Sequence, residues 1–144
     1  MRVSIGSDHA GFEQKQALVD YLVGKGYDVI DRGPDNDDRV DYPDYAAPVA
    51  HDVADGVAER GVLVCGTGIG MSLAANRHPG IRAALCTTEL HARFGRRHNN
   101  ANVLCLGARV TGVELALAIV GTFLENQFEG GRHQRRLDLL KVPV

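Results

Sequence analysis

Long apolar runs are absent from this sequence, and its opening residues turn polar within a few positions. A helix that spans a membrane needs about twenty mostly apolar residues, and an export signal needs an apolar segment near the start of the chain. We therefore expect neither membrane insertion nor export. The sequence predicts a cytoplasmic protein.

A strong net charge is also lacking. The formal charge is −2 at pH 7 and the isoelectric point is near 6.3, so the chain carries no overall basic field that would attract nucleic acid. We expect no nucleic-acid partner. Any anion-binding site must be built from local groups of Arg and His.

Cysteine is scarce, and its pattern excludes two classes of protein. The three cysteines are an odd number in a chain without a secretion signal, which favours reduced thiols over disulfides. No Cys-x-x-Cys pair is present to resolve a redox thiol. A spaced set of His, Cys and carboxylate ligands is also missing, so we expect no metal and no other cofactor.

The 144 residues, 44% of them apolar, are sufficient for one domain with an ordinary core. Short β-branched runs alternate with longer amphipathic stretches, which is typical of βαβ units. This rhythm predicts a single doubly wound α/β domain with a five-stranded parallel sheet and helices on both faces. The expected strands are residues 2–7, 27–31, 61–65, 81–86 and 103–107. The expected helices are residues 12–25, 45–55, 71–77, 88–97 and 113–125, with a short terminal helix through residue 141.

Chemistry-bearing residues follow the strands, at the edge where ligands bind in such folds. Asp8 and His9 follow the first strand, Cys65 ends the third, and Arg109 follows the fifth. Alone, Asp8 and His9 are equally well explained as a helix cap beside a surface histidine.

A glycine loop follows Cys65, with Gly66, Gly68 and Gly70 at every second position. Such a loop lets main-chain N–H groups approach an oxyanion. The spacing differs from the GxGxxG of dinucleotide sites, so it does not favour a dinucleotide ligand. A phosphatase loop of the Cys-x5-Arg type would need Arg where Met71 stands.

An isolated cysteine at the end of a strand is usually a small buried hydrophobe. Beside Cys65, however, the loop amides favour the thiolate, which can take a proton from carbon. Cys86 and Cys105 lack such a loop, so we expect them to be structural.

His98 precedes a strand, so it lies at the edge of the sheet opposite Cys65. If it is catalytic, we expect it to serve the site of a neighbouring subunit; the alternative is an ordinary helix terminus. Near the end of the chain, Arg132, His133 and Arg136 form a basic group that suits phosphate or is simply a solvated tail.

Taken together, these motifs resemble the ribose-5-phosphate isomerase B family, which includes galactose-6-phosphate and allose-6-phosphate isomerases. The resemblance spans essentially the whole chain. It rests on the segments 6–11, 41–43, 65–72, 75–77, 97–99, 107–109 and 129–136.

The resemblance implies that Cys65 moves the proton between carbons 1 and 2 with help from Thr67, while His98 and Asp8 open the furanose ring. It also implies homodimers, or pairs of dimers, with active sites shared across the interface. A family branch that uses Glu at the position of Met71 is not indicated. The implied substrate contacts are His9, Arg109, Arg132 and Arg136 for phosphate, with His133 in the same motif, Asn99 and Tyr42 for the sugar, and the amides of Gly66, Gly68 and Gly70 for the enediolate.

The expected substrate is therefore a phosphorylated sugar, and the expected reaction interconverts ribose 5-phosphate and ribulose 5-phosphate. Two alternatives stay open. One is an isomerase of a 6-phosphohexose; the other is a non-catalytic nucleotide- or phosphate-binding module, which would need the arginines but neither Cys65 nor His98.

Overall fold

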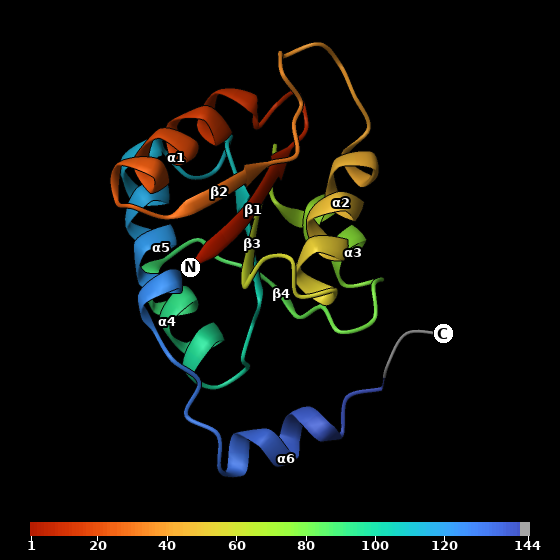
Figure 1. Ribbon diagram of the computed structural model, residues 1–144, viewed down its shortest axis with the longest axis vertical. Helices are drawn as coiled ribbons and strands as arrows, with labels where there is room; N and C mark the ends of the chain where they lie inside the picture. The colour runs from red at the N-terminus through yellow and green to blue at the C-terminus, as the bar shows by residue number, and fades with distance from the viewer. Residues whose placement is uncertain (142–144) are drawn as a thin grey trace.

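The computed structural model describes residues 1–141, which form an α/β fold around one sheet (Figure 1). The strands are β1 (Arg2–Ser7), β2 (Asp28–Asp31), β3 (Arg60–Cys65), β4 (Ala83–Leu85) and β5 (Val103–Gly107). The helices are α1 (Phe12–Gly24), α2 (Tyr42–Ala54), α3 (Ile69–Ala75), α4 (Glu89–Arg97), α5 (Val113–Glu125) and α6 (Arg132–Asp138).

All strand pairs are parallel, and the strand order is β2-β1-β3-β5-β4. The three inner strands are buried along almost their whole lengths because helices cover both sides of them. The predicted five-stranded doubly wound fold is confirmed.

Alternation along the central strands divides the core into two layers. Val62 and Leu104 belong to the cluster packed by α1, α4 and α5, whereas Leu63 and Val103 belong to the cluster packed by α2 and α3. Figure 1 shows the same division, with α1, α5 and α4 on one side of the sheet and α2 and α3 on the other. Successive side chains point to opposite faces of a strand, so the side chain of Cys65 belongs to the α2/α3 layer.

Several predicted boundaries were wrong, and two of them have a clear physical reason. Helix α2 begins at Tyr42 rather than at residue 45, because Asp41 is its N-cap and proline is tolerated in the first helical turn. Strand β4 is shorter than predicted. The side chain of Asn102 accepts the N–H of Arg82 at 2.8 Å, so this amide is not available to a sheet ladder before Ala83.

Helix α6 lies at one end of the molecule, away from the two helical layers (Figure 1). It ends at Asp138, before the predicted residue 141. Backbone and side-chain contacts between Glu129 and Arg97 tie the segment before α6 to the end of α4. Among the described residues, no helix is long and apolar enough to cross a membrane.

Candidate active site

The ends of β1 and β3 form the switch point of the sheet. The two strands are neighbours, but the chain leaves β1 toward α1 on one face and β3 toward α3 on the other. Connections that diverge in this way leave a crevice beyond the strand ends. The N–H of Asp8 donates to the carbonyl of Val64 at 3.1 Å and holds the first connection against β3.

Cys65 lies at this switch point with only 4% of its surface exposed. Its Sγ accepts a hydrogen bond from the main-chain N–H of Gly68 at 3.1 Å. Gly68 has φ 81°, and a Cβ there would approach the carbonyl carbon of Leu106 to 2.9 Å. Glycine is therefore required for the turn that directs this N–H at the sulfur. A donor at this position stabilises a thiolate.

The other two cysteines are in different surroundings. Burial raises the pKa of Cys86 to about 12. Burial also raises the pKa of Cys105, with Cys65 and Cys86 adding to the effect. Both remain protonated at neutral pH, in agreement with the structural role expected of them.

Arg109 and Tyr42 lie next to the first and the last glycine of the loop, respectively. The N–H of Arg109 donates to the carbonyl of Gly66 at 2.9 Å, and its guanidinium Nη1 lies 3.6 Å from where a Cβ of Gly66 would stand. The ring of Tyr42 lies 2.8 Å from the corresponding point at Gly70. Glycine at these positions leaves room for both side chains.

Thr67 and Asp8 complete this group, and both have local hydrogen bonds. Thr67 is exposed, and its Oγ1 accepts the N–H of Ile69 at 3.3 Å. Asp8 is 8% exposed, and its Oδ1 accepts the N–H of Gly11 at 3.0 Å. Because Gly11 is the N-cap of α1, this contact supports the start of the helix and keeps the carboxylate at the crevice.

His9 contacts the segment between β2 and α2, which contains Val40. Its Nδ1 accepts the N–H of Val40 at 3.2 Å. The switch-point group therefore comprises nine predicted site residues, namely Asp8, His9, Tyr42, Cys65, Gly66, Thr67, Gly68, Gly70 and Arg109.

A second group of predicted residues lies elsewhere. His98 is the C-cap of α4, and Arg132 and His133 open α6. An open cavity of about 290 Å³ is lined by two leucines and by four of the predicted site residues, namely His98, Asn99, His133 and Arg136.

The structure does not bring the two groups together within one chain. Cys65 pairs with Gly107 at one end of the sheet, whereas Gly61 pairs with Val103 at the other end, and His98 precedes Val103. Four residues of strand separate these ends by about 13 Å at 3.3 Å per residue.

The imidazole of His98 is in contact with two other rings. The ring of Phe94 lies 4.7 Å away between centroids, and that of His133 lies 4.2 Å away with planes 13° apart. Oε1 of Glu129 lies 3.8 Å from Nε2 of His98 and 3.7 Å from Nε2 of His133. Glu129 belongs to a segment that carries the resemblance, but the sequence assigned it no role.

Glu129 and the two histidines form a set of possible metal ligands that has no regular spacing in the sequence. The fold brings one possible ligand atom from each of these three residues within 4.8 Å of the others. A metal must lie near the plane of each imidazole that binds it. The rings are stacked almost in parallel, so their lone pairs do not converge on one point without ring rotation.

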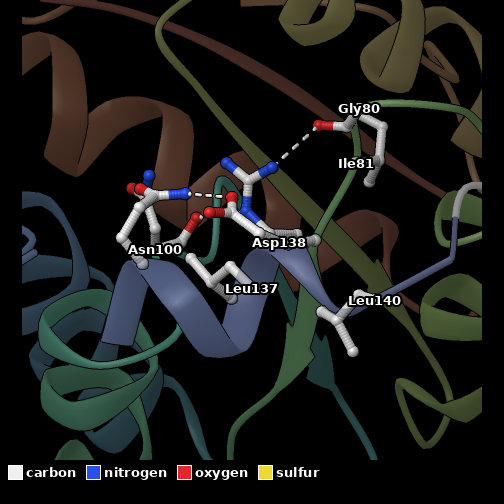
Figure 2. A pocket seen from close by; sticks show the side chains of 8 residues that line it. Gly80, Ile81, Asn100, Leu137, Asp138 and Leu140 are labelled. Atoms are coloured by element: carbon white, nitrogen blue, oxygen red, sulfur yellow. Dashed lines mark hydrogen bonds between the residues drawn. The ribbon is translucent and has the colours of Figure 1, made fainter. Parts of the chain in front are cut away.

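The cavity in Figure 2 adjoins the cavity of the second group, because Leu137 and Leu140 line both of them. It has a volume of about 270 Å³ between α6 and the segment that leads into β4, and Figure 2 shows Asn100, Leu137 and Asp138 at its wall. None of the predicted site residues lines it.

Exposed apolar side chains gather on the two helices that flank the edge strand β4. They are Ile69 and Leu73 on α3 and Leu90 and Phe94 on α4, each at least one third exposed. Leu90 and Phe94 also line an open cavity of about 330 Å³ beside β4. Clustered apolar surface of this kind is typical of a protein interface.

Comparison with known proteins gives consistent matches. A family model described as Ribose/Galactose Isomerase matches residues 3–140. Ribose-5-phosphate isomerase B of Escherichia coli (strain K12) is 48% identical over 139 residues, covering 96% of this chain and 93% of that protein. The structure of ribose-5-phosphate isomerase B from Clostridium thermocellum has a TM-score of 0.95 and 51% identity, covering 96% of this chain and 93% of that one. The structure from Thermotoga maritima has a TM-score of 0.94 and 52% identity, covering 95% and 94%. The matched range contains both groups of predicted residues.

Proposed function

The chain belongs to the ribose/galactose isomerase family, and from this premise we propose that Cys65 is the carbon base with which it interconverts ribose 5-phosphate and ribulose 5-phosphate. The protein is a sugar-phosphate isomerase, and its close relatives are isomerases of ribose 5-phosphate. The 6-phosphohexose and the non-catalytic alternatives are not favoured.

The observation that carries the proposed mechanism is the hydrogen bond from Gly68 to the sulfur of Cys65. A thiolate held by this donor takes the proton from C2 of the open-chain aldose, and the electrons move to give an enediolate. A proton passes from O2 to O1, and the thiol returns its proton to C1, which produces the ketose. Loop amides beside the sulfur are placed to stabilise the negative charge on oxygen, and Thr67 assists next to them.

The remaining predicted residues have roles before and around this step. Asp8 and His98 open the furanose ring. Asn99 and Tyr42 contact the sugar. Phosphate is held by four residues, His9, Arg109, Arg132 and Arg136, because arginine offers paired donors to phosphate oxygens. Fixing the phosphate keeps the reacting carbons beside Cys65.

We further propose a cytoplasmic homodimer with two shared sites. Cys65 and His98 are at opposite ends of their own sheet, so a second copy must supply one of them. The apolar side chains of α3 and α4 beside β4 offer a surface for that copy. In a two-fold dimer, each contact occurs twice and completes two equivalent sites. The three buried cysteines are unpaired, as expected in a reducing compartment.

Assay of the purified protein on ribose 5-phosphate, allose 6-phosphate and galactose 6-phosphate tests this function. We expect the highest kcat/KM with ribose 5-phosphate. Higher kcat/KM with a hexose phosphate would change the assigned substrate. Phosphate binding without turnover of any of the three would contradict an isomerase.

A further inference from the structure

His98 has two ring neighbours that come from different parts of the chain. Phe94 lies one turn earlier on α4, with its plane tilted 36° from that of the imidazole. His133 comes from α6 and lies nearly parallel to it, with planes 13° apart. Two ring neighbours in contact limit the freedom of the imidazole to rotate about its side-chain bonds, so its nitrogens keep a defined direction.

The surroundings of His133 do not suit a phosphate ligand. Its side chain is 6% exposed, and its Nε2 is buried without a hydrogen-bond partner among the described residues. This nitrogen faces a carboxylate oxygen of Glu129, 3.7 Å away, which would repel a phosphate. Burial lowers the pKa of His133, and the neighbouring Arg132 lowers it further. A neutral imidazole at neutral pH stacks on His98 without charge repulsion.

Glu129 is held firmly beside both imidazoles. Its Oε2 accepts a hydrogen bond from Nε of Arg97 at 2.6 Å, and its main-chain N–H donates to the carbonyl of Arg97 at 3.0 Å. These two bonds join the segment before α6 to the last turn of α4. The other carboxylate oxygen then lies within 4 Å of Nε2 of His98 and of His133. An anion at this distance stabilises positive charge on an imidazole.

We propose that His133 and Glu129 are positioning residues for His98, and that His133 acts through ring stacking rather than by binding phosphate. The inference rests on the proposed function, in which His98 takes part in opening the sugar ring. His133 holds one face of the imidazole, and Glu129 supports the charge that appears when His98 carries a proton.

The chemistry of ring opening explains why the orientation matters. The anomeric O1–H loses its proton, the bond between C1 and the ring oxygen breaks, C1=O forms, and the ring oxygen gains a proton. The overall change is a proton transfer, so one group must remove a proton and another must supply one. Efficient transfer needs a short, aligned contact, and an error of about 1 Å costs on the order of a hundredfold in rate.

Replacing His133 by alanine and by phenylalanine separates stacking from phosphate binding. His133→Ala removes the ring, and we expect kcat on ribose 5-phosphate to fall at least about tenfold with KM within about twofold. His133→Phe retains a flat ring without nitrogen, and we expect kcat to recover to within about threefold of the original. If both variants instead raise KM and weaken inhibition by inorganic phosphate, His133 is a phosphate ligand and the inference is wrong.

A second readout isolates ring opening from proton transfer at carbon. Ribulose 5-phosphate cannot close a furanose ring, because its C5 oxygen carries the phosphate. Exchange of its C1 proton with deuterium oxide, followed by proton NMR, therefore needs Cys65 but no ring opening. We expect His133→Ala to retain this exchange while losing turnover of ribose 5-phosphate, and Cys65→Ala to lose both. Equal loss of exchange and turnover in folded His133→Ala would overturn the inference.

Glu129→Gln provides an independent variant of nearly unchanged size. We expect the same pattern as for His133→Ala, with exchange retained and turnover reduced. Glu125→Gln is the matched control, because Glu125 is an exposed residue at the end of α5, and we expect it to change neither activity. Melting curves check that each variant is folded. Normal turnover in both Glu129→Gln and His133→Ala would refute the positioning role, whereas absence of exchange and turnover in the unaltered protein would refute the proposed function itself.

Discussion

The main-chain N–H of Gly68, which lies three residues after Cys65, donates a hydrogen bond to Sγ of Cys65 at 3.1 Å. The contact requires the left-handed conformation of Gly68, since φ of 81° is costly for residues with a side chain. It also distinguishes Cys65 from Cys86 and Cys105, whose pKa values are raised by burial. One hydrogen bond thus separates a candidate base from two inert thiols.

Replacement of Cys65 by alanine should remove most of the turnover of ribose 5-phosphate. We expect a loss of about a thousandfold or more, because general base catalysis contributes on the order of a hundredfold to ten-thousandfold and no neighbouring group replaces the thiolate. Steady-state kinetics on the folded variant measure it. Cys86→Ala is the control, and we expect its kcat to stay near normal. Near-normal turnover of folded Cys65→Ala would show that another group is the base.

Removal of metal should leave the rate unchanged. The proposed reaction uses only a thiolate, amides, imidazole and phosphate contacts, and the stacked rings of His98 and His133 do not direct their lone pairs to one point. Prolonged dialysis against EDTA, followed by the isomerase assay, tests the expectation. A rate that falls with EDTA and returns with zinc, magnesium or manganese would contradict it and point to the group of Glu129 and the two histidines.

Mixed dimers should regain activity that neither parent has. Cys65→Ala and His98→Ala proteins are both expected to be inactive on ribose 5-phosphate. After subunit exchange, a heterodimer contains one site with both groups intact, and up to about half of the dimers are of this kind at equal concentrations. We expect activity to reappear. Continued inactivity, with exchange demonstrated by mass spectrometry, would mean that the site is not shared.

Acid stability should depend on Asp52. Its carboxylate accepts hydrogen bonds from Ser4 and from two nitrogens of Arg32, each at 2.7 Å, and so joins α2 to β1 and to the segment after β2. The Arg32 contact lowers the pKa of Asp52, opposed by burial and helped by Ser4. The ionised carboxylate of Asp52 contributes fully to the free energy of unfolding above its ordinary pKa of about 3.9. This contribution is lost as the pH falls through the lower pKa of the folded state.

We therefore expect Asp52→Asn to reduce the free energy of unfolding by about 1.5–3 kcal/mol at pH 7, the usual size for a hydrogen bond to a charged group. Urea titrations at several pH values measure the difference between the two proteins. That difference should shrink below about pH 4. A difference that stays constant down to pH 2 would show that the loss does not come from the ionised carboxylate.

Much of the fold was predictable from local patterns. Five apolar runs alternate with amphipathic stretches, and that periodicity depends only on neighbours along the chain, which is why the sheet and its flanking helices could be inferred. The glycine loop after Cys65 was visible for the same reason, since its residues are adjacent. A predicted strand boundary was wrong where a side chain far along the chain took the place of a partner in the sheet. The side chain of Asn102 accepts the main-chain N–H of Arg82 in this way.

The fold class and the family could therefore be inferred from the sequence alone, and so could Cys65 as a candidate for the catalytic base. The contact among His98, Glu129 and His133 could not be inferred in this way, because a strand, a helix and a turning segment separate α4 from α6 along the chain. The direction of that segment depends on Gly130 and Gly131, whose φ angles are 70° and 57°. A contact made by such a change of direction leaves no periodic signal, because it results from backbone angles and packing between residues far apart in the chain.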